Sequence, residues 1–320
     1  MRCLGSYGRA SGQGKYTTAI EHSFLFGSDI LRNNTNSSHR NPYRRDNRTK
    51  LFCDTSNMTE KYDKLLDILR GMNSVVLAFS GGVDSTFLLK ALKDSGTRSM
   101  AVIASSATMP ASELRHAEQM AQLICTPYRI IETSELDNPD FTRNPANRCF
   151  YCKDELFMKL FRIADAEGFE SVADGSNIDD LSDIRPGREA ALRCGVKSPL
   201  IEAEFSKAEI RELSRELGLP TWSKPSAPCL SSRFPYGIEI TPAGLKRVEE
   251  SEEFIKSLGF SELRVRSHHG DLARIEVRAD EIDLLLRPGR RELIAGRLRE
   301  LGFKRITVDM DGFRSGNLND

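Results

Sequence analysis

The spacing of hydrophobic residues predicts regular structure from Thr59 onward. Apolar residues recur every three or four positions between Tyr62 and Met72, which indicates a helix capped by Thr59. The uninterrupted apolar run Val75–Phe79 indicates a buried strand. The two patterns then alternate. Further strands are predicted at Ser99–Ser105, Tyr128–Ile131 and Ser171–Ala173, with helices around Phe87–Leu92, after Pro110 and from about Cys152 to Glu167.

Alternating strands and helices predict an α/β fold, a parallel sheet with helices on both faces. Ligands of such sheets bind beyond the carboxyl ends of the strands. Ser206 opens a capped helix that stops at Gly218, and residues 222–237 form a long loop with three prolines. A helix from Thr241 and three predicted strands then indicate a small C-terminal α+β domain. Those strands are Leu263–Ser267, Ala273–Arg278 and Arg305–Val308.

Composition divides the chain into three parts. Residues 1–57 carry nine basic and four acidic residues without a sustained period, so we expect a disordered segment or a spurious extension upstream of Met58. Residues 58–233 then form the α/β domain, and residues 234–320 form a substrate or oligomerisation domain. Beyond residue 57 the chain has 37 basic and 42 acidic residues, net −5, which disfavours a nucleic-acid partner. No apolar run is long enough to span a membrane.

The stretch Ser80-Gly81-Gly82-Val83-Asp84-Ser85 follows the first predicted strand and opens a helix. Backbone N–H groups at such a turn favour a phosphate or pyrophosphate. The glycines permit positive φ and close approach, and the serine hydroxyls add donors. Asp84 either positions Mg²⁺ or caps the helix. The stretch lacks the Gly-Lys-Ser/Thr of a Walker A loop and resembles the PP-loop of the N-type ATP pyrophosphatases, enzymes that split ATP into AMP and pyrophosphate.

Seven sparse, irregularly spaced cysteines favour a reduced, cytoplasmic setting over a disulfide framework. Cys149 and Cys152 form a C-x-x-C pair at a loop-to-helix junction, and Cys229 lies in the proline-rich loop. Structural zinc normally takes four protein ligands. Three cysteines fit an iron–sulfur cluster with one open iron, and we favour this over thiol-only chemistry and over zinc.

Six motifs together resemble the LarE family over about residues 58–320. They are SGGVDS at 80–85, RCFYCK at 148–153, DGSNIDD at 174–180, KPSAPCLSSR at 224–233, VRSHHGDLARIE at 265–276 and DGFR at 311–314. The resemblance implies an ATP-dependent sulfur transferase of nickel-pincer nucleotide biosynthesis. Such enzymes adenylate a carboxylate of pyridinium-3,5-biscarboxylic acid mononucleotide and replace the AMP with sulfur. The three cysteines place the chain nearest the branch thought to hold a [4Fe-4S] cluster; in another branch the cysteine matching Cys229 surrenders its own sulfur.

The resemblance also implies site residues. The loop 80–85, with Asp174, Asn177 and Asp180, is expected to bind ATP and Mg²⁺. Arg264 and Arg266, which share one face of a strand, and Arg233 are candidate ligands of the substrate phosphate. Glu276 binds a metal or pairs with an arginine. The expected partners are the nucleotide substrate, a sulfide or cysteine-derived sulfur source and further copies of the chain.

Other functions fit part of the sequence. A tRNA thiolase also joins a PP-loop to three cysteines and a cluster, but Val83 replaces the lysine typical of its loop. An amide-forming synthetase explains residues 80–85 and leaves the cysteines idle. A non-catalytic regulator that binds ATP or a cluster belongs to a third class; it would release no pyrophosphate with any carboxylate substrate.

Overall fold

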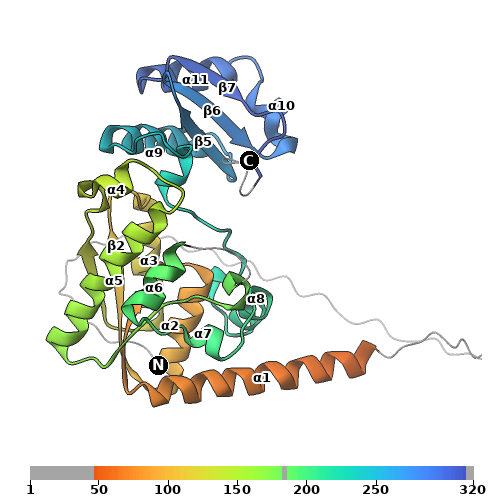
Figure 1. Ribbon diagram of the computed structural model, residues 1–320. Helices are drawn as coiled ribbons and strands as arrows, with labels where there is room; N and C mark the ends of the chain where they lie inside the picture. Colours follow the sequence, from red (N-terminus) through yellow and green to blue (C-terminus); the bar gives the residue numbers. More distant parts are fainter. Residues whose placement is uncertain (1–46, 182–185, 315–320) are drawn as a thin grey trace, which may run out of the picture. The chain divides into compact units, whose positions relative to one another are not determined.

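The computed structural model describes residues 47–181 and 186–314, with only the backbone for 47–57 (Figure 1). The predicted disorder of residues 1–57 therefore falls largely outside the described residues. The first helix, α1, runs from Asn47 to Gly71, so the predicted helix start at Thr59 is wrong. Thr59 lies inside this helix because the chain already has helical backbone before it.

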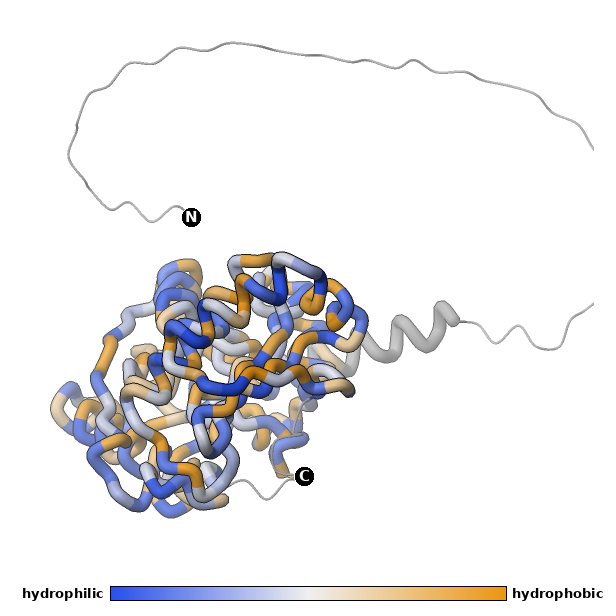
Figure 2. Tube along the Cα trace, turned by 90° about the horizontal axis from the view of Figure 1, so that it is seen from above, coloured by the Kyte–Doolittle hydropathy of each residue, from blue (hydrophilic) through white to orange (hydrophobic). Residues whose placement is uncertain are grey.

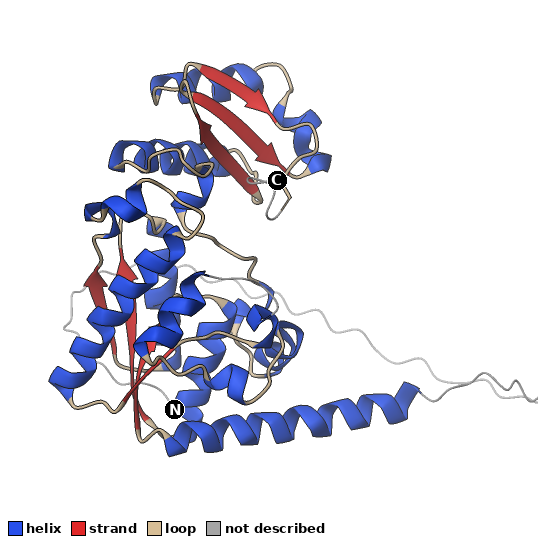
Figure 3. Cartoon of the chain, viewed as in Figure 1, coloured by secondary structure: helices blue, strands red, loops and turns tan. Residues whose placement is uncertain are grey.

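Four parallel strands form the first sheet, in the order β3-β2-β1-β4 (Figure 3). Their bounds are β1 Ser74–Ala78, β2 Arg98–Ser105, β3 Tyr128–Glu132 and β4 Ser171–Ala173. The chain builds outward from β1 to β3 and then returns to place β4 on the other side of β1. The carboxyl ends of β1 and β4 therefore lie at the point where the strand order reverses, which is where open α/β sheets bind ligands.

Both faces of this sheet are buried under helices, as the sequence pattern predicted. Leu77 and Ile103 pack with α1, with α2 (Val83–Ser95), with α3 (Ala111–Ile124) and with α8 (Lys207–Glu216). Val76 and Val102, which point the opposite way, pack with α5 (Arg148–Glu167) and α6 (Pro186–Cys194). Strands buried on both faces are continuously apolar, which explains the run at Val75–Phe79.

The second sheet has three strands in the order β5-β6-β7, with β5 and β6 antiparallel. Its bounds are β5 Leu263–His268, β6 Leu272–Val277 and β7 Arg305–Val308. One face packs on α9 (Pro242–Ser257) and α11 (Arg290–Glu300) through residues such as Val265 and Ile275. Phe141 and Leu230, from before residue 234, join the same core.

Short helical segments complete the described chain. They are α4 Pro139–Thr142, α7 Pro199–Glu202, α10 Ile282–Leu285, and the 3₁₀ turns η1 Glu135–Asp137, η2 Ile178–Leu181, η3 Pro220–Ser223, η4 Leu230–Arg233 and η5 Ala279–Glu281. Hydrophobic and hydrophilic residues are interspersed along the described chain (Figure 2). Among the described residues, no helix is long and apolar enough to cross a membrane.

Candidate active site

The glycine loop, residues 80–85, follows β1 and includes the first turn of α2. Gly81 has φ +67°, and a Cβ built there would lie 2.6 Å from the Cα of Ala117, so the loop packs directly on α3. Gly82 has φ −76°, so the expected positive φ is needed only at Gly81. Gly82 is the N-cap of α2 and no side chain caps it. The N–H groups of the first turn are therefore left for a ligand.

Serine hydroxyls line the same turn. The Oγ atoms of Ser80 and Ser85 are 3.2 Å apart, and the Ser80 Oγ also accepts a hydrogen bond from the Gly82 N–H at 3.4 Å. Val83 is buried, and its position at the start of α2 still lines the adjoining cavity. The loop therefore offers backbone and hydroxyl donors to one region of space.

Asp84 is not a helix cap, so that alternative is wrong. Its carboxylate pairs with Lys207 of α8 and accepts a hydrogen bond from the Asn177 side-chain amide at 3.2 Å. Asn177 is buried and is not part of the cavity lining. Asn177 therefore positions Asp84 and does not face the cavity. The Asp84 carboxylate does not cap its own helix because Asn177 and Lys207, on distant segments, bind it instead.

Asp174 and Asp180 follow β4 and line the cavity with the glycine loop. Asp174 accepts hydrogen bonds from the hydroxyls of Ser176 and Ser198, both at 2.8 Å. Asp180 accepts from the Asn177 N–H at 3.0 Å. A Cβ on Gly175 would lie 3.0 Å from the Ser85 backbone nitrogen, so the two loops at the strand-order reversal touch.

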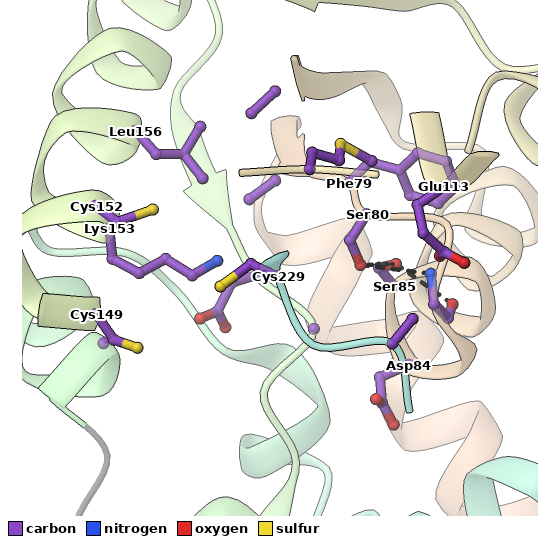
Figure 4. Close-up of a pocket in the computed structure, with 18 of the residues that line it drawn as sticks. Phe79, Ser80, Asp84, Ser85, Glu113, Cys149, Cys152, Lys153, Leu156 and Cys229 are labelled. Atoms are coloured by element: carbon purple, nitrogen blue, oxygen red, sulfur yellow. Dashed lines mark hydrogen bonds between the residues drawn. The ribbon is translucent and has the colours of Figure 1, made fainter. Parts of the chain in front are cut away.

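A cavity of about 660 Å³ joins the glycine loop to the three predicted cysteines (Figure 4). Cys149 and Cys152 are one turn apart on α5, and Cys229 faces them from the loop that precedes η4. Lys153 also points toward Cys229 in Figure 4. Cys125 and Cys194 lie elsewhere, and none of these five cysteines forms a disulfide. The three cysteines selected from the sequence therefore line one cavity.

The pKa values of the two helical thiols are raised. Burial, with the nearby charge of Glu135, raises the pKa of Cys152 to about 12. Burial and the neighbouring Cys229 also raise the pKa of Cys149. Across the part of the chain that the structure describes, no three His, Cys, Asp or Glu side chains are arranged to hold a metal ion. Because the raised pKa values favour protonated thiols, binding of a metal group here would have to displace thiol protons.

A second cavity of about 470 Å³ is lined by all three predicted phosphate ligands. Arg233 forms a buried two-point pair with Glu252, at 2.8 Å for both contacts. Arg266 is held in the same way by Glu276. Arg264 instead lies over the Phe313 ring, and no ion pair of Arg264 is found among the described residues. Burial lowers its pKa to about 10, so it remains charged at neutral pH.

Glu276 is fully buried, and its two oxygens accept from Arg266 and Arg274. The arginine pairing considered from the sequence is therefore the arrangement in the structure, and a metal there would have to displace both guanidinium groups. Of the three predicted phosphate ligands, Arg264 is therefore the one available to an anionic ligand, and Arg148 and Lys256 also line this cavity.

Sequence reasoning missed several residues of the first cavity. Lys224 contacts the glycine loop, Lys207 holds Asp84, and the buried Glu135 accepts the Thr108 hydroxyl. Lys224 is the first residue of the motif KPSAPCLSSR at 224–233, and its place in this motif was the signal that could have identified it. Lys207 and Glu135 gave no local signal, because their partners are distant in sequence.

Comparisons with known proteins identify the family. The chain is 36% identical over 266 residues to the pyridinium-3,5-bisthiocarboxylic acid mononucleotide synthase of Lactiplantibacillus plantarum, covering 82% of this chain and 95% of that protein. The chain belongs to the LarE family. Another relative of this LarE chain is an uncharacterized protein of Synechocystis sp., 41% identical over 82% of this chain and 98% of that protein. An uncharacterized protein of Methanocaldococcus jannaschii is 27% identical over 83% of this chain and 98% of that protein. No family model matches the chain.

Proposed function

We propose that this LarE-family protein is an ATP-dependent sulfur transferase. It adenylates a carboxylate of pyridinium-3,5-biscarboxylic acid mononucleotide and converts it to a thiocarboxylate, in biosynthesis of the nickel-pincer nucleotide. The observation that carries the proposal is the single cavity shared by the glycine loop and Cys149, Cys152 and Cys229. The name of the Lactiplantibacillus plantarum relative, a synthase of the bisthiocarboxylic product, supports the same substrate class.

The first step activates the carboxylate, whose oxide leaving group is otherwise too poor. A carboxylate oxygen of the substrate attacks the α-phosphorus of ATP, the α–β phosphoanhydride bond breaks, and pyrophosphate leaves. The glycine-loop amides and the N-terminus of α2 hold the pyrophosphate. Asp84 and Asp174 line the same cavity and would hold a Mg²⁺ ion, which would offset the charge of the pyrophosphate. The product is an acyl-adenylate beside the cysteines.

The second step brings sulfur to the acyl carbon. A sulfur nucleophile adds, the bond to the AMP oxygen breaks, and AMP leaves with the electron pair. When Cys229 is the nucleophile, the resulting thioester loses the Cys229 α-proton and the Cβ–S bond breaks, which leaves a thiocarboxylate and dehydroalanine. A [4Fe-4S] cluster on Cys149, Cys152 and Cys229 would instead supply an exchangeable sulfide. Cys149, Cys152 and Cys229 line the same cavity as the glycine loop, so each of them could act as a ligand of such a cluster.

The second cavity provides a place for the phosphate of the substrate, with Arg264 as its ligand. Residues 225–227 line both cavities, so a substrate phosphate bound at Arg264 keeps the pyridinium carboxylates close to the ATP cavity. We propose the division at residue 234 on this basis: residues 58–233 activate and transfer, and residues 234–320 hold the substrate. A homo-oligomer remains a prediction.

The test is an assay of purified protein with ATP, Mg²⁺ and pyridinium-3,5-biscarboxylic acid mononucleotide. We expect AMP and pyrophosphate in equal amounts. The mass of the substrate should increase by the difference between one sulfur and one oxygen atom for each carboxylate that reacts. A parallel reaction with unmodified tRNA is the control and is expected to yield no thiolated nucleoside. Thiolation of tRNA without reaction of the mononucleotide would overturn the proposal.

A further inference from the structure

Lys224 lies where the glycine loop meets the loop that carries Cys229. Its Nζ donates to the Gly81 carbonyl at 3.3 Å and to Glu113 of α3 at 2.7 Å. The side chain is 15% exposed and lines the first cavity. A cation is therefore held at the turn whose backbone N–H groups favour an anion.

Two other cations that line this cavity, Lys207 and Arg211, bind elsewhere. Lys207 is paired with Asp84, and Arg211 donates to the backbone carbonyls of Trp222 and Lys224. His116 also contacts Gly81, but burial and the charge of Lys224 lower its pKa, which disfavours its cationic form. Among the described residues, Lys224 is the side-chain cation that hydrogen-bonds to the backbone of the glycine loop, whereas Lys207 pairs with the side chain of Asp84.

The partner of Lys224 can be exchanged. Glu113 is about a quarter exposed and lines both cavities, so it can be solvated when the lysine leaves. A triphosphate on the glycine loop carries several negative charges, whereas Glu113 carries one. The flexible four-carbon stem of lysine allows Nζ to reach from the carboxylate to a phosphate.

The backbone around Lys224 leads directly to Cys229. Arg211 fixes the carbonyl of Lys224 at 2.9 Å, and beyond Cys229 the Leu230 N–H donates to the Thr108 carbonyl at 2.8 Å. Between these two anchors, residues 225–228 are exposed, and residues 225–227 form the wall shared by the two cavities. A change of partner at Lys224 therefore acts on a short segment fixed at both ends.

We propose that Lys224 is a ligand of the ATP phosphates, and that it exchanges Glu113 for them when ATP binds. The exchange couples occupancy of the glycine loop to the position of Cys229 and of the 225–227 wall. Sulfur chemistry is thereby prepared only when the nucleotide is in place. This inference rests on the proposed function, because it assumes that ATP binds at residues 80–85.

The test uses α,β-methylene-ATP, which cannot be cleaved between the α and β phosphates, with the full-length protein. Calorimetry gives its Kd, and mass spectrometry gives the rate at which iodoacetamide alkylates Cys229 with and without it. We expect Lys224→Met to weaken binding about tenfold or more, a loss of about 1.4 kcal/mol, and to abolish the nucleotide-dependent change in alkylation. Lys224→Arg should restore part of both effects.

Lys246→Met is the matched control, because Lys246 is 77% exposed and pairs with Glu250 at only 3.8 Å. It is expected to behave as the wild type, and equal melting temperatures establish that the variants are folded. Binding within twofold of the wild type by Lys224→Met, with the alkylation change retained, would overturn the inference and leave the proposed function standing. A wild type that binds no nucleotide would overturn both.

Discussion

Replacement of Gly81 by alanine is expected to lower kcat/KM for ATP about 100-fold, the loss typical of an ångström-scale misplacement of a site. The new Cβ would lie 2.6 Å from the Cα and 2.9 Å from the Cβ of Ala117, and the residue would be fixed at φ +67°. The contact is with backbone, so no side chain can rotate away. The loop must move off α3, and its N–H groups then no longer converge. Pyrophosphate release at several ATP concentrations measures the effect.

Gly96→Ala is the matched control for this prediction. Gly96 ends α2 with φ +74°, yet nothing lies within 4 Å of the position that its Cβ would take. Alanine there costs about 1 kcal/mol of backbone strain and leaves the glycine loop in place. Gly96→Ala should therefore lose stability without losing kcat/KM. Equal losses of activity in both variants would refute the packing argument.

Arg233→Met is expected to lower the free energy of unfolding by about 3–5 kcal/mol, because removal of one partner leaves Glu252 as an uncompensated buried charge. Both side chains are less than 5% exposed, and Arg233 also donates to the carbonyls of Pro228 and Cys229. Arg264→Met should change stability little and should weaken substrate affinity instead. Chemical denaturation and the KM for the mononucleotide separate these two outcomes.

The loss in Arg233→Met should depend on pH in a defined direction. Burial raises the pKa of Glu252, but the hydrogen bonds and charge of Arg233 outweigh it, and the net pKa lies below the ordinary value. Such a group stabilises the fold above its unfolded pKa of about 4.3, and the stabilisation is lost as the pH falls through the lower, folded-state pKa. The difference between wild type and variant should therefore shrink in acid. A difference that grows in acid would contradict this assignment.

The sequence predicted those parts of the molecule that depend on local pattern. Strand runs, the glycine turn after β1 and the C-x-x-C pair on α5 are local, and they were placed correctly. Parallel order also requires the strand ends to meet, so Asp174 could be expected near the glycine loop. The start of α1 at Asn47 was not predicted because residues 47–58, before the predicted start at Thr59, show no amphipathic period in the sequence.

Pairings between distant residues could not be predicted. Arg233 and Arg264 are both candidate phosphate ligands in the sequence, but of these two only Arg233 pairs with a buried carboxylate, Glu252 of α9. Asp84 appeared able to cap its own helix, and Lys207, 123 residues later, takes it instead. Such choices depend on tertiary packing, so a motif can name the residues of a site without assigning their roles.

The most direct test of the central claim is a single turnover with Cys229→Ala, the mononucleotide and ATP. We expect this variant still to release pyrophosphate, because its glycine loop is intact. It should form no thiocarboxylate, because sulfur reaches the acyl carbon on or beside Cys229. In the wild type, loss of one sulfur from Cys229 identifies that residue as the donor, and an unchanged Cys229 mass identifies exchangeable sulfide. Thiocarboxylate formation by Cys229→Ala at the wild-type rate would contradict the account.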